Sequence, residues 1–464
     1  MKMAKRVFVM IIVVCCLLVS GIGQAREINV AFDIKDMADM SDFDPNKPVI
    51  PTGDTIKIAV VASFSGPAAL AGQIFWICVQ WAAHDVNKRG GVLVDGKRKL
   101  VQVIKADHQS RVDVCKKVCE RMVLKEKVHV LWGTDGSHLQ KIMNQVAAKY
   151  KVIALGTVSS SDELMDAENF TRYAFMTCFS TEQIGRAFGY FYGQIRKKEK
   201  RFYILCQDYL FGHSVAEGFK KGLQEYYPEA KIVGEDYHRL FLTDFAPYLT
   251  KIKASKAEVI FTGDWMPDAG NLLRQARQMG IKLPFANIYL TEPNFLHQLG
   301  VEGTKGLVNI SQFGTEAPVF KTPEQIKYYK AWHDLWASKW GPPYNTRLYE
   351  HSGGNLSSWM AQTYWLLSVI QRAGSTNPEK IIKVFEGDVC QFSNGKILEM
   401  RACDHKVIQD LHIQIFVPPS QQRQYFNIPP YYAYKGCSSV GMSYRIPKEK
   451  ILPKADPRLC KEQH

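Results

Sequence analysis

Short apolar runs alternate with longer amphipathic segments from residue 56 to about residue 155. The apolar runs predict buried strands at 56–62, 100–106, 128–132 and 152–155. The segments between them place apolar residues three and four positions apart, which predicts helices that end near residue 87 and span 111–125 and 138–150. Continuous apolar strands that alternate with such helices indicate a parallel sheet covered on both faces.

The same alternation starts again near residue 181. It predicts strands at 202–206, 232–237, 259–262, 285–289 and 307–310, and helices at 181–195, 213–226, 245–254, 269–279, 323–339 and 354–373. Open α/β sheets bind ligands at the carboxyl ends of their strands, so two facing sheets form a cleft. We therefore expect two α/β lobes that close on a small molecule.

The N-terminus has the pattern of a secretory signal. Lys2, Lys5 and Arg6 precede an apolar run of about 13 residues at 7–19, and a small-x-small site ends at Ala25. A run of this length is too short to span a bilayer of about 30 Å as a helix. We expect residues 1–25 to be a cleaved signal peptide, followed by a polar arm at 26–54 and a soluble mature protein.

Charge and motifs exclude several classes of protein. The formal net charge of +14 falls by three when the signal peptide is removed, and the remaining basic residues are dispersed along the chain. We therefore expect no nucleic-acid partner. The sequence has no Gly-x-Ser-x-Gly elbow, no His-Glu-x-x-His helix and no P-loop, so we expect no enzyme activity, no cofactor and no metal.

Nine of the eleven cysteines remain after cleavage at residue 25, and an oxidising compartment permits disulfides between them. Cys115 and Cys119 lie four apart on a predicted helix without a zinc-binding pattern, and we interpret them as packing residues. The better candidates for a disulfide are Cys390, Cys403, Cys437 and Cys460. Because Cys390 and Cys403 flank a probable hairpin around 393–396, we predict that these two form a bridge.

Several segments in one order carry a resemblance to a known family. They are an opening strand and loop at 56–73, a helix end with paired glycines at 85–92, an acidic and aromatic turn at 207–212, and the segments 243–245 and 272–280. Together they resemble the periplasmic leucine/isoleucine/valine-binding proteins and their relatives that serve transporters of amino acids, amides and urea. The resemblance extends over residues 55–417.

The resemblance implies a type I periplasmic-binding fold: two Rossmann-like lobes with parallel central sheets, joined by a three-segment hinge. The three crossovers are expected near 176–181, 310–314 and 347–352. Lobe one would comprise 55–178 plus 312–350, and lobe two 179–311 plus 351–430. Residues 431–464 would form a C-terminal tail.

The resemblance also implies which loops hold the ligand. Family members grip a ligand carboxylate with hydroxyl and backbone N–H groups at two loops of lobe one, which correspond here to 133–137 and 156–160. We expect Ser137 and Ser159 to be donors, with Gly136 and Thr157 beside them. The first loop opens onto a helix, whose N-terminus favours an anion. The alternative, that both serines only cap or turn the chain, stays open.

In lobe two, Tyr289 stands where amino-acid binders have an acidic residue, which argues against a standard α-amino acid ligand. Nearby acids and an aromatic residue could still contact a ligand amine or ring. The candidates beyond lobe one's two loops are Ser65, Ala71, Phe211, Asp264, Trp265, Tyr289 and Glu292.

The resulting hypothesis is a monomeric, periplasmic solute-binding protein of an ABC transporter. It would bind an amino acid or a related small carboxylate or amide in the cleft and deliver it to the membrane permease. A ligand-sensing receptor of the same fold, without a role in transport, is the alternative.

Overall fold

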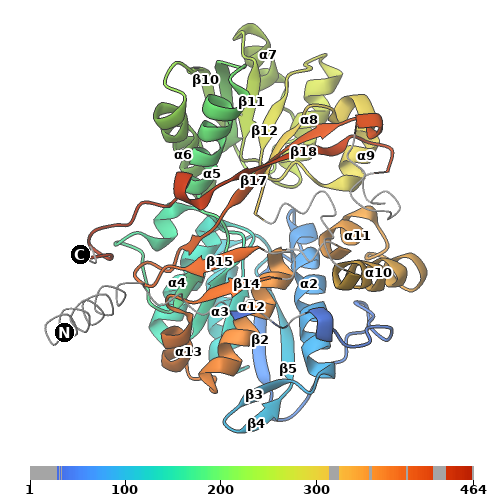
Figure 1. The fold of residues 1–464 in the computed structure, drawn as a ribbon, viewed down its shortest axis with the longest axis vertical. Helices are drawn as coiled ribbons and strands as arrows, with labels where there is room; N and C mark the ends of the chain where they lie inside the picture. The colour runs from blue at the N-terminus through green and yellow to red at the C-terminus, as the bar shows by residue number, and fades with distance from the viewer. Residues whose placement is uncertain are drawn as a thin grey trace, which may run out of the picture.

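The computed structural model describes residues 29–30, 32, 34–312, 323–354, 358–392, 396–421 and 435–461. They form two α/β lobes, drawn one above the other in Figure 1. The predicted signal peptide at 1–25 lies outside the described residues. Among the described residues, no helix is both long and apolar enough to cross a membrane.

Lobe one is built on a parallel sheet with strand order β5-β2-β6-β7-β8. Its strands are β2 (Ile56–Ala62), β5 (Val101–Asp107), β6 (Val130–Gly133), β7 (Ile153–Gly156) and β8 (Ala174–Met176). Strand β2 is central and pairs with β5 on one side and β6 on the other. It is an almost fully buried apolar run because helices cover both faces of the sheet.

Helices from two distant parts of the chain belong to lobe one. The first set is α2 (Ala69–Lys88), α3 (Val112–Leu124) and α4 (Ser137–Tyr150), and the second is α10 (Pro323–Ser338), α11 (Arg347–Gly354), α12 (Ser358–Ala373) and α13 (Pro378–Phe385). Helix α12 packs against α2 and α13. Its residues 360–367 are all buried, as expected of a helix enclosed on every side.

Lobe two has a seven-stranded sheet with order β10-β9-β11-β12-β13-β17-β18. The strands are β9 (Arg201–Gln207), β10 (Lys231–His238), β11 (Val259–Thr262), β12 (Phe285–Asn287), β13 (Val308–Ser311), β17 (Leu411–Val417) and β18 (Ser439–Ile446). The first five in this order are parallel, whereas β17 and β18 are antiparallel to their neighbours. Figure 1 shows β17 entering this sheet from the side of lobe one.

The helices of lobe two are α5 (Thr181–Tyr190), α6 (Leu210–Tyr226), α7 (Ala246–Ala254), α8 (Asp268–Gln278) and α9 (Pro293–Thr304). Helix α5 starts with a capping box between Ser180 and Gln183 and continues as a π-helical turn over Phe191–Arg196. Its glycines let α6 approach closely: a Cβ on Gly189 would lie 2.0 Å from the carbonyl oxygen of Gly222.

The prediction that residues 351–430 belong to lobe two is wrong for the part before residue 409. A small sheet of β1 (Asn29–Val30), β14 (Val389–Gln391), β15 (Ile397–Met400) and β16 (Val407–Ile408) follows α13. Buried side chains of α12, α13, β14, β15 and β16 belong to the same hydrophobic core as β2 and α2. A helical or strand pattern does not by itself specify which of two cores an element joins.

The chain crosses between the lobes at 177–180, after β13, and at 409–410. At the first crossing, Cys178 belongs to the core of lobe one and Phe179 to that of lobe two. The third crossing is the short link between β16 and β17. The prediction of a crossover at 347–352 is wrong, because these residues lie in α11.

The segments predicted as an N-terminal arm (26–54) and a C-terminal tail (431–464) both pack against the lobes in their described parts. From the N-terminal segment, Met37, Met40 and Phe43 are buried in the core of lobe one. The C-terminal segment contributes the edge strand β18 to lobe two and then returns to lobe one. The segment 431–464, predicted as a C-terminal tail separate from both lobes, thus packs on both of them in its described part, 435–461.

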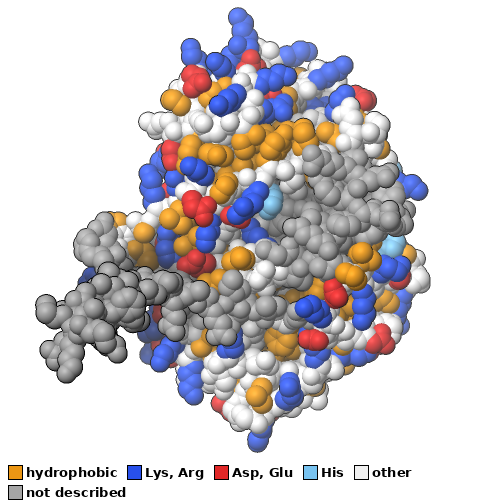
Figure 2. Space-filling model, viewed as in Figure 1, with side chains coloured by type: hydrophobic (Ala, Val, Ile, Leu, Met, Phe, Trp, Pro, Cys, Tyr) orange, Lys and Arg blue, Asp and Glu red, His pale blue; other side chains and the backbone are white. Residues whose placement is uncertain are grey.

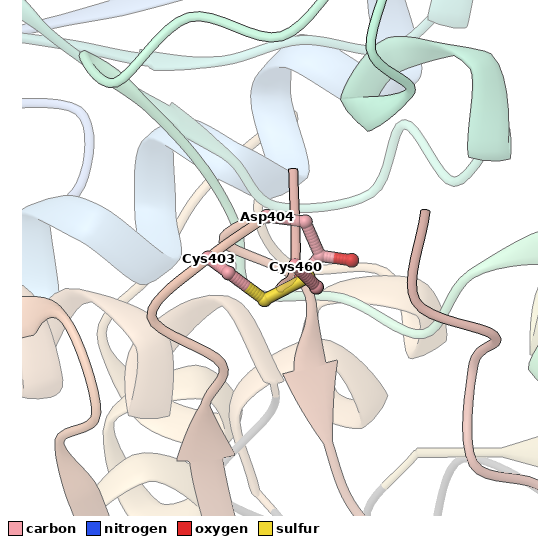
Figure 3. A group of neighbouring side chains, drawn as sticks. All are labelled: Cys403, Asp404 and Cys460. Carbon is pink, nitrogen blue, oxygen red and sulfur yellow. A yellow bond between two sulfur atoms is a disulfide. The ribbon is translucent and has the colours of Figure 1, made fainter. Parts of the chain in front are cut away.

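The predicted Cys390–Cys403 disulfide is wrong, since Cys403 is bonded to Cys460 (Figure 3). Cys390 is buried in β14, where it pairs with Leu398 across the predicted hairpin. The turn at 393–395 lies outside the described residues. The hairpin was correct, but the C-terminal segment that folds back onto Cys403 has no local signal in the sequence.

Candidate functional site

A cavity of about 120 Å³ lies between the two lobes. Cavities of roughly 150 Å³ hold a single aromatic ring, so this one suits a small molecule. Lobe one contributes Ala71, Ile74, Phe75, Asp135, Gly136, Ser137, Val158, Ser159, Leu348, His351 and Trp359, and lobe two contributes Tyr209, Phe211, Trp265, Met266, Tyr289, Thr291 and Glu292. Most of these side chains are apolar or aromatic, as in typical ligand sites.

The loops after β6 and β7 form the polar part of the lobe-one wall. Gly136 is the N-cap of α4 and Ser137 is its first residue, so both lie at the helix end that favours negative charge. The hydroxyl of Ser159 donates to the carbonyl oxygen of Thr134 at 2.6 Å. This bond ties the two loops together and uses the donor that we expected to serve the ligand.

Asp135 is a buried carboxylate in the first of these loops. Its Oδ1 lies 2.8 Å from Nε2 of His108 and accepts from the hydroxyl of Thr134 at 3.0 Å and the backbone N–H of Ser63 at 3.3 Å. Its Oδ2 makes no hydrogen bond within the described part of the chain. Burial alone would raise the pKa of Asp135, but the hydrogen bonds from His108 and Ser63 hold it below its ordinary value.

Aromatic side chains form the lobe-two wall and reach across to lobe one. The indole N–H of Trp265 donates to the hydroxyl of Tyr209 at 2.8 Å. The hydroxyl of Tyr289 donates to the carbonyl oxygen of Val158 at 3.4 Å, and the ring of Tyr209 lies edge-on to that of His138. The two walls therefore contact each other directly, as in a closed binding protein.

Glu292 brings a second carboxylate to the cavity. It is the N-cap of α9, and its two oxygens accept the backbone N–H groups of Asn294 at 2.8 Å and Phe295 at 2.7 Å. Burial raises the pKa of Glu292. Burial also lowers the pKa of His351 to about 4, so this imidazole is neutral near pH 7. Among the described residues that line the cavity there is no Lys or Arg.

Of the eleven predicted ligand-binding residues, the cavity brings together eight: Ala71, Gly136, Ser137, Ser159, Phe211, Trp265, Tyr289 and Glu292. Three lie elsewhere. Ser65 is exposed and donates to Asp107, and Thr157 is buried behind the wall. Asp264 is fully buried, with its Oδ2 2.8 Å from Nε2 of His238. A carboxylate that follows a buried strand can thus serve an internal pair instead of the cavity.

Sequence reasoning missed several lining residues. Asp135 stood inside a loop that we singled out for its hydroxyl and glycine residues, and its acidic side chain was the available signal. Tyr209 belonged to a segment quoted for the resemblance. Trp359 and Leu348 come from α12 and α11, whose placement beside the cavity depends on the packing of lobe one.

Two other polar groupings do not form comparable sites. A wider groove of about 900 Å³ along α5 and α6 is lined by acids and bases together, including Glu182, Arg186, Lys220 and Glu225. Cys403, Asp404 and Cys460 lie within 4.8 Å of one another (Figure 3). Their sulfurs are bonded to each other and Asp404 pairs with Arg401, so the group offers no thiolate to a metal.

The surface gives no sign of one concentrated basic region on the face shown in Figure 2. Lys and Arg side chains are scattered over both lobes there, with Asp and Glu among them.

Comparisons with known proteins agree with this architecture. A family model described as periplasmic binding protein matches residues 55–416. An amino acid binding protein of Pseudomonas aeruginosa is 27% identical over 235 residues, which cover 50% of this chain and 59% of that protein. A Leu/Ile/Val-binding protein of Escherichia coli is 23% identical over 255 residues, or 55% of this chain and 67% of that protein. The match to the Pseudomonas relative thus spans less than two thirds of its length.

Solved structures share the fold. An ABC-transporter solute-binding protein from Rhodopseudomonas palustris, in complex with 3,4-dihydroxybenzoic acid, has a TM-score of 0.69 at 16% identity, covering 85% of this chain and 98% of that one. A branched-chain amino acid transporter substrate-binding protein from Streptococcus pneumoniae, in complex with isoleucine, has a TM-score of 0.62 at 22% identity, covering 78% and 97%.

Proposed function

Because the chain belongs to the periplasmic binding protein family, we propose that it is the extracytoplasmic solute-binding component of an ABC transporter. The observation that carries this proposal is the cavity between two lobes, lined by residues from both. A ligand in such a cavity touches both walls only when the lobes are closed, so its binding energy favours the closed state. The closed form is then the one that docks on the permease and releases its cargo.

The proposed ligand is a small molecule with an apolar or aromatic body that carries the polar group of an amino acid or of a related carboxylate or amide. Rings of Phe75, Phe211, Trp265, Tyr289 and Trp359 line the cavity and can pack against such a body. The relatives are named as amino acid or Leu/Ile/Val-binding proteins, and one structural neighbour holds an aromatic acid. The relatives are binding proteins rather than enzymes, so we expect capture without turnover.

Native mass spectrometry of freshly purified protein tests this function. We expect a co-purified small molecule, and we expect that molecule to stabilise the stripped protein and to be recovered chemically unchanged. Small-angle scattering on the stripped protein with and without it should show a smaller radius of gyration in its presence. Turnover of the molecule, or an unchanged radius on binding, would contradict the proposal.

The periplasmic location rests on the segment 1–25 and on the family. Peptidase cleavage after Ala25 predicts that the mature protein isolated from the producing cell begins at Arg26. N-terminal sequencing of secreted protein checks this directly. A chain that retains Met1 and its apolar run would argue against export by this route.

A further inference from the structure

One oxygen of the buried carboxylate of Asp135, a residue that lines the cavity, has no hydrogen-bond partner within the described residues. The residue is only 8% exposed and lines the cavity. Three donors converge on Oδ1, from His108, Thr134 and Ser63, whereas Oδ2 has no hydrogen bond within the described residues. A buried carboxylate oxygen without a donor costs free energy, so a ligand that supplies a donor gains this contact in full.

The surroundings of Asp135 keep it negatively charged. The backbone N–H of Ser110 donates to Nδ1 of His108 at 3.2 Å, so a neutral imidazole carries its proton on Nε2, which lies 2.8 Å from Oδ1 of Asp135 and 2.6 Å from the hydroxyl of Thr134. The N-terminus of α4 begins immediately after Asp135 and favours the same negative charge. The carboxylate of Asp135 thus already supplies the negative charge that the N-terminus of α4 favours. A ligand anion placed beside this helix end would be repelled by that carboxylate.

Several other polar groups of the cavity are satisfied or neutral, whereas the indole N–H of Trp359 also makes no hydrogen bond within the described residues. Both oxygens of Glu292 accept backbone N–H groups at the start of α9. The hydroxyl of Ser159 donates to Thr134, and His351 is neutral near pH 7. The described residues that line the cavity include two carboxylates and no Lys or Arg, so they disfavour a ligand whose only polar group is a carboxylate.

We propose that Oδ2 of Asp135 is the anchoring acceptor of the site and that it takes an N–H group of the ligand, from either an ammonium or a primary amide. This inference rests on the proposed function and names the ligand chemistry of the same cavity. It reverses our expectation from the sequence, in which the lobe-one loops hold an anion. The apolar body of the ligand then lies against the aromatic wall of lobe two, where Trp265 and Tyr289 close over it.

Three probes that share one body separate the possible chemistries. They are 2-phenylethylamine, which is a cation, 3-phenylpropanamide, which is neutral with an N–H₂ group, and 3-phenylpropanoate, which is an anion. Calorimetry on stripped wild-type protein should rank the amine, the amide or both at least tenfold above the propanoate. Comparing the amine with the amide shows which N–H source the site takes.

Asp135→Asn removes the charge and replaces one acceptor oxygen by a donor nitrogen, and it should weaken the preferred nitrogen probe by about 10- to 100-fold. The matched control is Asp107→Asn, which changes a carboxylate at the end of β5 that accepts from Ser65 and Phe64 and does not line the cavity. The control should leave the ranking and the affinities unchanged. If Asp135→Asn does not fold, the ranking of the three probes on the wild-type protein still tests whether the site prefers a ligand with an N–H group.

The inference is overturned if the propanoate binds as well as the nitrogen probes, if neither nitrogen probe binds, or if a folded Asp135→Asn binds them unchanged. A co-purified ligand without any N–H group would also overturn it while leaving the proposed function intact. The proposed function fails on other grounds, namely turnover of the bound molecule or no closure on binding.

Discussion

At the scale of single residues, two buried side chains near the cavity hold loops rather than ligand. Ser159 joins the loops after β6 and β7 through the carbonyl of Thr134, and Asp268 holds the loop before α7 by accepting the backbone N–H of Phe241 at 2.8 Å. Each bond stabilises a wall whose shape the ligand needs. Removing either hydrogen bond should therefore change the stability of the protein directly, and should change ligand affinity only through the shape of the wall.

Ser159→Ala should lower the free energy of unfolding by about 1–2 kcal/mol, because it leaves a buried carbonyl without its donor. Urea denaturation of the variant and wild type checks this value. Ligand affinities should fall by a similar factor for every compound, since the loop and not the ligand has lost a contact. Ser65→Ala, at an exposed position, is the control and should change neither quantity. A variant that reorders a ligand panel without losing stability would show that the hydroxyl contacts the ligand after all.

Asp268 gives a pH dependence with a defined sign. Burial, with the nearby charge of Asp264, raises the pKa of Asp268 from 3.8 to about 6, although Gln207 and Phe241 donate to it. Because the folded pKa lies above the unfolded one, this carboxyl favours the folded state below pH 4 and loses that contribution as the pH rises to about 6. Asp268→Asn should therefore gain stability relative to wild type between pH 4 and pH 7, by about 2 kcal/mol. Urea denaturation at both pH values measures the difference, and a difference that is the same at both would contradict this assignment.

At the scale of elements, the packing of α5 on α6 depends on bare backbone. Gly185 and Gly189 face the carbonyls of Gly218 and Gly222 so closely that a methyl group on either helix has no space. Tight approach of this kind fixes one register of the two helices, which then cover the first strands of the lobe-two sheet.

Gly189→Ala should destabilise the protein by at least about 2 kcal/mol, because the new Cβ would stand 2.0 Å from a backbone oxygen that cannot rotate away. Gly341→Ala is the matched control, since nothing lies within 4 Å of its added Cβ. Thermal unfolding of both variants provides the comparison. Equal melting temperatures for Gly189→Ala and Gly341→Ala would mean that α5 and α6 can move apart without loss of stability.

Most long elements could be predicted from the chain because their apolar period is strong. The predicted strands at 56–62 and 259–262 have the observed bounds, and the helix predicted at 323–339 is α10. The short strands β8 and β16, and the helix α9, were not predicted. Runs of two or three residues in these strands are too brief to show a period.

The predictions that failed concern contacts between segments far apart in the sequence: which lobe a helix joins and which cysteines pair. Helix α12 has the apolar pattern of a core helix, but the pattern is equally suited to either lobe, and the choice is made by its contacts with α2 and Asp388. The Cys403–Cys460 bridge depends in the same way on the return of the C-terminal segment. At the cavity, several residues that follow strand ends were found, although Asp135 and Tyr209 were not. Trp359 was missed because it arrives from that same helix.

At the scale of the whole molecule, the C-terminal segment after β18 connects the two lobes a further time. On lobe two, Ile451 is buried and the hydroxyl of Tyr226 donates to the carbonyl of Lys450 at 2.6 Å. On lobe one, Arg401 donates to the carbonyl of Pro453 at 2.6 Å, and the disulfide to Cys403 ends the segment. A covalent strap of this kind should limit how far the lobes separate when the cavity is empty.

Cys460→Ser should therefore increase the radius of gyration of the stripped, ligand-free protein, because the strap can then detach from lobe one. Small-angle scattering before and after treatment with dithiothreitol provides an internal control. The wild type should expand on reduction, whereas the variant should not respond. Superimposable curves for oxidised wild type and variant would show that the strap does not restrain opening.

The interleaved course of the chain has a consequence for how the protein is made. Lobe one needs α12 and β14–β16, and lobe two needs β17 and β18, so neither core is complete until residues beyond 400 have emerged from the ribosome. Domains usually fold as units when their last residues become available. A growing chain without a finished core stays extended, and an extended chain is the form that can be threaded through a membrane before it folds on the far side.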